Sequence, residues 1–197
     1  MPTRTTIADG DVHIELPKIK GSRFLAAARR VRTPEEADAF VAAVQAAHAD
    51  ATHNAFAWKL EGTERTGDDN EVRGTAGPPI LQHIGGAGLV DIAIVVTRYY
   101  GGTKLGKGGL IRAYGAAAAA AIAAAEHVEE VALAHLSVSC DYKLLGPLQG
   151  TIQQLGGTVT DTQYGDAIAL KVSIPTEQEA ALRDALRERS AGRATVD

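Results

Sequence analysis

The chain has 197 residues, of which 45% are hydrophobic and 22% are charged, and its formal net charge is −4. This composition is typical of a globular protein and excludes an intrinsically disordered chain. The acidic balance also excludes a general attraction of the whole surface to nucleic acid, so any such contact must come from a local basic segment.

The single cysteine, Cys140, excludes an internal disulfide and a cysteine-rich zinc site. A chain without disulfides is typical of a reducing compartment. None of the histidines has the spacing of zinc ligands, and the first residues are polar, unlike a signal peptide. The longest apolar run, Ala116 to Ala125, is shorter than the roughly 20 residues that span a bilayer. We therefore expect a cytoplasmic protein with no membrane association, no metal, no cofactor and no catalytic residue.

The first two thirds of the chain predict strands and helices in mixed order. Apolar alternation or apolar runs predict strands over residues 11–16, 22–30, 53–60 and 90–96, and helices are predicted over residues 34–48, 77–84 and 107–127. Thr33 and Glu36 have the spacing of a capping box before the first helix. Residues 61–76 are polar and rich in carboxylates, and we predict a long exposed loop there.

The last third predicts a second domain with the order strand, helix, strand, strand, helix and a short final strand. Strands are expected over residues 134–140, 158–164 and 168–174, with helices ending near 156 and 190. Thr176 and Glu179 predict a second capping box. This order is typical of a ferredoxin-like sandwich. We predict an α/β fold of two-layer α+β sandwiches, with domains at residues 1–132 and 133–197.

The strongest functional signal is the segment of residues 97–114, which lies between a buried strand and a helix. Its basic residues are not balanced by any acidic residue from Ile92 to Ala125, and its glycines allow close approach of the backbone to a ligand. These features predict an anion or nucleic-acid site, to which tyrosines would add stacking surfaces. The residues predicted to form this site are Arg98, Tyr99, Gly101, Gly102, Lys104, Gly106, Lys107, Gly108, Gly109 and Arg112.

Two other interpretations of this segment stay open. Its glycines also suit tight packing of a helix on a sheet, although packing does not explain the absence of acidic residues. The spacing from Gly101 to Gly106 and Lys107 is that of a phosphate-binding P-loop. Gly108 then stands where such a loop needs the hydroxyl that binds magnesium.

Three sequence blocks resemble the YigZ/IMPACT family. They are residues 97–114 (TRYYGGTKLGKGGLIRAY), residues 68–77 (DDNEVRGTAG) and residues 51–54 (ATHN), and residues 22–24 (SRF) also fit. The chain departs from the family at Asn70, where glycine is usual, and at Val72, where proline is usual. Asparagine can still adopt a positive φ, so the turn at Asn70 is expected to persist.

The resemblance implies a first domain like the second domain of a small-subunit ribosomal protein and a second domain like a ferredoxin-like domain of elongation factor G. It points to RNA, the ribosome or a translation factor as partner, and a protein partner is a further alternative. The function we expect is that of a non-enzymatic RNA-associated regulator of translation, and the alternative is a small-molecule phosphate-binding enzyme or sensor. We also hypothesise that the acidic loop gates the basic segment through Asp68, Asp69, Glu71 and Thr75.

Overall fold

The structure, a computed structural model, describes residues 3–197 and contains two compact units, residues 4–129 and residues 130–197 together with Thr3. The first unit contains β2 (Asp11–Glu15), β3 (Arg23–Arg30), α1 (Pro34–Ala47), β4 (His53–Leu60), β5 (Thr63–Gly67), α2 (Gly77–Gly86), β6 (Ile92–Tyr99) and α3 (Lys107–Ala124). It also contains most of β1 (Thr3–Ile7) and of β7 (His127–Val131). Within the described residues, no helix is long and apolar enough to cross a membrane.

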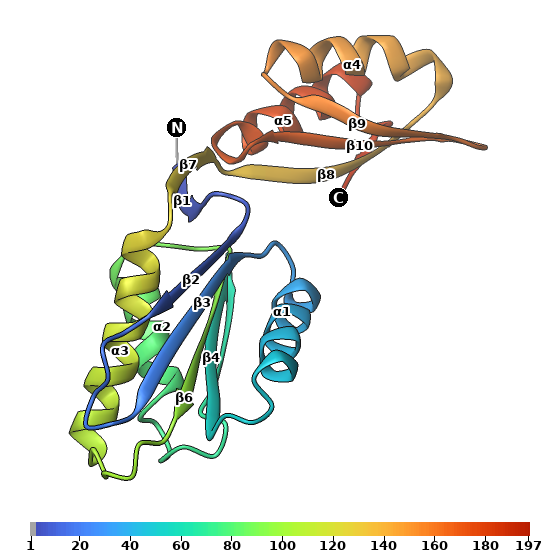
Figure 1. Cartoon of the computed structure of the whole chain (residues 1–197). Coiled ribbons are helices and arrows are strands. Elements are labelled where there is room, and N and C mark those ends of the chain that lie inside the picture. Colours follow the sequence, from blue (N-terminus) through green and yellow to red (C-terminus); the bar gives the residue numbers. More distant parts are fainter. Residues whose placement is uncertain (1–2) are drawn as a thin grey trace. The chain divides into compact units, whose positions relative to one another are not determined.

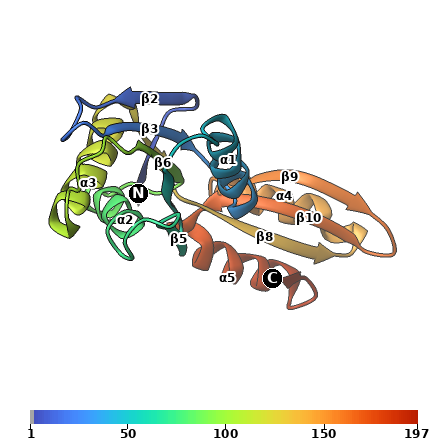
Figure 2. The same ribbon diagram turned by 60° about the horizontal axis from the view of Figure 1, so that its bottom comes forward.

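The first unit has a five-stranded sheet in the order β2-β3-β6-β4-β5, in which all neighbouring strands are antiparallel. The nearly all-apolar strand β6 lies at the centre of this sheet, as its sequence predicted. Helices α2 and α3 cover one face and α1 covers the other (Figures 1 and 2). At the start of α1, the Glu36 amide donates to Thr33 Oγ1, as expected of a capping residue.

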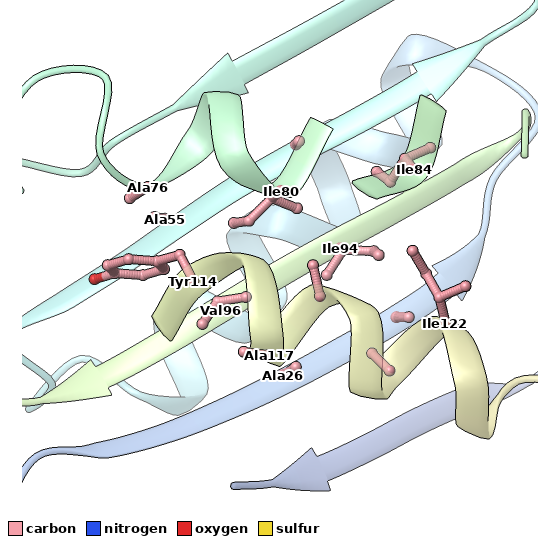
Figure 3. Close-up of a cluster of buried hydrophobic side chains, with 14 of the residues drawn as sticks. Ala26, Ala55, Ala76, Ile80, Ile84, Ile94, Val96, Tyr114, Ala117 and Ile122 are labelled. Atoms are coloured by element: carbon pink, nitrogen blue, oxygen red, sulfur yellow. The ribbon is translucent and has the colours of Figure 1, made fainter. Parts of the chain in front are cut away.

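The larger core lies between the sheet and the pair α2–α3 (Figure 3). Short alanine side chains such as Ala117 let α3 lie close to the sheet, while Ile80 and Ile84 of α2 fill the space beside it. Tyr114 is fully buried in this cluster, and its ring packs edge-on against Phe24 at a centroid distance of 5.4 Å. The core thus carries one phenol hydroxyl toward the end of the sheet where β4 begins.

The prediction of an unbroken loop over residues 61–76 was wrong, because residues 63–67 form β5. This strand pairs only with β4, at the edge of the sheet, and its side chains are largely exposed. An edge strand of this kind needs no apolar alternation, so its sequence resembles that of a loop. Strands β1 and β7 also escaped the sequence analysis; they form a separate two-stranded sheet.

The second unit is a ferredoxin-like sandwich, as predicted. It contains β8 (Leu133–Cys140), a 3₁₀ turn (Tyr142–Leu144), α4 (Leu145–Gln154), β9 (Thr158–Tyr164), β10 (Ile168–Pro175), a second 3₁₀ turn (Thr176–Gln178), α5 (Glu179–Ser190) and β11 (Thr195–Val196). The antiparallel sheet has the order β11-β8-β10-β9, and one apolar cluster joins it to both helices.

Two details of this unit bear on the sequence analysis. Cys140 is 2% exposed, and burial raises the pKa of its thiol, so it is a core residue of this unit. The prediction of a second capping box was wrong, because Thr176 begins a 3₁₀ turn and Gln178 precedes α5 without a side-chain capping bond.

Candidate anion-binding cleft

A cleft of about 520 Å³ opens in the first unit where β6 ends and where β4 and α3 begin. Its walls combine apolar side chains with charged ones, which is the usual composition of a ligand pocket. Its lining consists of Thr52, His53, Glu71, Val72, Arg98, Tyr100, Lys104, Leu105, Gly106, Lys107 and Leu110. We call Glu71, Arg98 and His53, together with the buried Tyr114 behind them, the floor of the cleft, and Tyr100, Lys104, Gly106 and Lys107 its rim.

The floor is organised around a single carboxylate oxygen, Glu71 Oε2. Arg98 Nη1 donates to it at 2.5 Å and the Tyr114 hydroxyl donates to it at 3.1 Å. His53 Nε2 lies 3.5 Å from the same oxygen. The side chains of Glu71 and Arg98 are 6% and 5% exposed, so this ion pair is screened little by solvent.

Each side chain of the floor is fixed by a second contact. His53 stands opposite Arg98 in the antiparallel pairing of β4 with β6, so the two share a face of the sheet. His53 Nδ1 donates a hydrogen bond to the Asp69 carbonyl oxygen at 2.8 Å, so Nε2 faces Glu71 and donates to it only when the imidazole is protonated. The Arg98 guanidinium lies 5.4 Å from the Tyr100 ring centroid.

The Tyr114 hydroxyl remains a donor at all ordinary pH values. Burial raises the pKa of Tyr114 far above its ordinary value, and the negative charge of Glu71 raises it further. A guanidinium is likewise always charged in proteins. The floor therefore presents two permanent donors to one oxygen position.

The acidic loop, residues 68–76, is held mainly by its own carboxylates. Asp68 accepts hydrogen bonds from the amides of Gly74, Ala76 and Gly77 at the start of α2. Asp69 accepts from the Asn54 amide, and the Thr75 hydroxyl donates to the Val72 carbonyl. Among the predicted gating residues, Glu71 alone reaches the basic segment, and the gating role itself stays a prediction.

The rim carries positive charge without carboxylate partners. Lys104 and Lys107 are exposed, and neither makes an ion pair within the part of the chain that the structure describes. Helix α3 begins at Lys107 after Gly106, whose φ is 72°, with no side-chain cap and no acidic residue in its first turn. Cations beside the positive end of an uncapped helix are unfavourable by themselves, and an anion would relieve this arrangement.

The predicted site residues are divided between the cleft and other parts of the first unit. Arg98 lies in the floor of the cleft, where it is 4% exposed and bound to Glu71, and the phosphate contact that the sequence suggested for it stays a prediction. Tyr99 points to the opposite face, where its hydroxyl bonds Asp50 and lies 3.0 Å from His48, because neighbours in a strand face opposite sides. Arg112 lines a separate depression beside Lys20.

The glycines also divide between packing and exposure. A Cβ on Gly101 would stand 1.9 Å from the carbonyl carbon of Gly21, so Gly101 is required by the close approach of two backbones. Gly102, Gly108 and Gly109 belong to the turn and the first turn of α3, outside the cleft lining.

Neither His53 nor Tyr114 was among the residues that the sequence predicted to form the site. Both stand in the blocks that carry the family resemblance, and that was the available signal. Their meeting with Glu71 depends on strand pairing and on the path of the acidic loop, which local patterns do not reveal. No group of three histidine, cysteine or carboxylate side chains within residues 3–197 is placed to hold a metal ion.

Comparison with known proteins places this chain in a family. The Impact N-terminal domain matches residues 20–122, and a domain of unknown function, DUF1949, matches residues 138–193. The chain belongs to the IMPACT family. It is 34% identical to the IMPACT family member YigZ of Escherichia coli over 180 residues, covering 89% of this chain and 88% of the relative. It is 31% identical to the family member YvyE of Bacillus subtilis, covering 90% of this chain and 83% of the relative.

Two solved structures share the fold of this chain. A crystal structure described as that of a hypothetical protein has a TM-score of 0.75 and 32% identity, covering 100% of this chain and 97% of the other. A crystal structure of a Thermus thermophilus protein has a TM-score of 0.52 at 14% identity, covering 100% of this chain and 28% of the other. The second likeness concerns the fold alone.

Proposed function

We propose that this IMPACT family member binds single-stranded RNA at the cleft, as a non-enzymatic protein of the translation machinery. The observation that carries the proposal is the rim, where Lys104 and Lys107 have no carboxylate partner among residues 3–197 and lie beside the uncapped start of α3. In a chain with a net charge of −4, this is a local site for phosphate groups. RNA, the ribosome or a translation factor in the cytoplasm is the setting that we propose.

The apolar part of the lining suits a nucleobase. Tyr100 and Val72 both line the cleft and are 44% and 43% exposed. A base stacked on an aromatic ring gains about 1–3 kcal/mol, largely independent of its identity. Such binding gives affinity with little sequence preference, because phosphate contacts position a strand without reading it.

The test is a titration of labelled single-stranded RNA at several salt concentrations with the full chain and with a Lys104→Gln, Lys107→Gln variant. Loss of two phosphate contacts should lower the slope of log affinity against log salt by about 1.4, at roughly 0.7 per contact. Folding of the variant should be unchanged, because both lysines are exposed.

The matched control is Arg187→Gln, Arg189→Gln in the last turn of α5, which removes the same charge from the other unit. This control should keep the wild-type salt slope. Equal losses of affinity in both variants would mean that only net charge matters, and absence of RNA binding at low salt would reject the proposal.

A second candidate is a small phosphorylated ligand, held by an enzyme or sensor. It is favoured by the size of the cleft, because about 520 Å³ falls within the roughly 300–1,000 Å³ of small-molecule sites. A ligand of this kind would bind whether or not it were joined to RNA, so mononucleotide competition against labelled RNA separates the two candidates.

A further inference from the structure

Three groups of the floor converge on one oxygen atom. Arg98 Nη1, the Tyr114 hydroxyl and His53 Nε2 lie 2.5, 3.1 and 3.5 Å from Glu71 Oε2. They come from β6, α3 and β4, so the sheet and its helix layer hold their backbones, and the Asp69 carbonyl of the acidic loop holds the His53 ring as well. This is the arrangement of an anion receptor, and the carboxylate of Glu71 occupies it from within the same chain.

The receptor needs an anion at all times. Arg98 is almost fully buried and always charged, and Ser22 Oγ and the Phe24 and Tyr100 rings beside it bring no negative charge. An oxyanion from solution would preserve this balance if it replaced the Glu71 carboxylate. The floor also lines the cleft, which gives a ligand a route to it.

Glu71 lies on a stretch of the loop that can move away from the floor. Asp68 and its amide partners anchor the loop to α2, while Asn70, Val72 and Arg73 around Glu71 are exposed. A rotation of this short stretch would move the carboxylate into solvent without breaking the pairing of β5 or the start of α2. The left-handed backbone at Asp69 and Asn70 marks the turn that would bend.

We propose that Arg98, Tyr114 and His53 form a binding site for a phosphate monoester, and that Glu71 is its intramolecular competitor. A monoester is the chemistry that fits, because Lys104 and Lys107 line the same cleft and match the second charge of a dianion. The site goes beyond the proposed RNA contact, whose internal phosphodiesters carry one charge each. The monoester belongs either to a free metabolite or to the phosphorylated end of an RNA.

Removal of the competitor should increase affinity. With a binding-competent state populated at about 10% or less, Glu71→Gln should bind inorganic phosphate about ten-fold more tightly than the wild type, measured by calorimetry. Phosphate should also raise the melting temperature of this variant more than chloride at equal ionic strength. Glu64→Gln, which removes an exposed carboxylate of β5, should leave phosphate affinity unchanged.

A variant that fails to fold does not end the test. Glu71→Asp keeps the charge on a shorter side chain that reaches the floor poorly, and it should show a gain of the same direction. Equal or weaker phosphate binding by both variants would overturn the proposal, as would an equal gain in Glu64→Gln.

Adding Arg98→Met to Glu71→Gln should abolish the gain, because it removes the main donor. RNA oligomers with a 5′-phosphate and a 5′-hydroxyl then identify the source: preference for the phosphate indicates an RNA end, and equal binding indicates a free monoester. The rim variant Lys104→Gln, Lys107→Gln tests RNA binding separately, so failure of either proposal leaves the other standing.

Discussion

The floor and the rim of the cleft use positive charge in opposite ways. In the floor, Arg98 is buried and bound to a carboxylate, so its charge is part of what holds the unit together. At the rim, Lys104 and Lys107 are exposed and make no ion pair within the described residues. Because a buried pair is costly to break and an exposed cation is nearly free to remove, changes in the floor should alter stability as well as phosphate binding, whereas changes at the rim should alter RNA binding alone.

The largest effect is expected from Arg98→Met. This change leaves Glu71 without its counter-ion, and breaking a buried pair costs about 3–5 kcal/mol of unfolding free energy. We expect about 3 kcal/mol, because Glu71 lies on an exposed stretch of loop and can turn toward solvent. Urea unfolding followed by the fluorescence of Trp58, the single tryptophan and 4% exposed, reports on the first unit alone.

The control for Arg98→Met is the double variant Glu71→Leu, Arg98→Met, which replaces both charges by apolar groups. It should regain most of the lost stability, because an apolar pair carries no desolvation cost. A double variant as unstable as Arg98→Met would show that the guanidinium acts through its packing rather than through the pair.

A smaller effect on stability is expected when either of two glycines in residues 97–114 is replaced by alanine. Gly101→Ala places a Cβ 1.9 Å from Gly21, which forces two backbones apart and should cost about 1–3 kcal/mol. Gly108→Ala lies in the first turn of α3 with only the end of Arg112 nearby, at 3.4 Å, and should stabilise the helix by up to about 1 kcal/mol. Thermal unfolding of both variants is the measurement, and equal signs would contradict the division between packed and open glycines.

Much of the fold could be predicted from the sequence, because buried strands and helices have characteristic local patterns of apolar residues. The apolar run of β6 and the strict alternation of β10 predicted a strand at each place, and both strands are confirmed. The edge strand β5 escaped because a strand with one neighbour and two exposed faces needs no pattern. The sequence therefore predicts interior elements better than edges.

The candidate site could be predicted only in part, because local patterns do not show which strands pair. Counting charges along residues 97–114 grouped Arg98 with the lysines, although a strand sends Arg98 and Tyr99 to opposite faces. The carboxylate that neutralises Arg98 lies 27 residues earlier. A charge pattern therefore indicated a basic segment, while strand pairing decided which of its cations face inward.

The smallest effect concerns an exposed pair at the other edge of the sheet, between Asp11 of β2 and Arg29 of β3. The hydrogen bond from Arg29 lowers the pKa of Asp11 below its ordinary 3.8, despite some opposing desolvation. Its contribution to stability is therefore complete above the unfolded-state pKa and is lost as the pH falls through the lower folded-state pKa. Asp11 and Arg29 are 37% and 44% exposed, so screening limits the contribution to about 1 kcal/mol or less.

Asp11→Asn should accordingly be slightly less stable than the wild type at about pH 6, and the difference should fade toward about pH 3. Urea midpoints from Trp58 fluorescence measure both values. A difference that persists at low pH would assign the effect to side-chain shape rather than charge. A difference as large as that of Arg98→Met would remove the contrast between buried and exposed pairs, because solvent would then weaken neither.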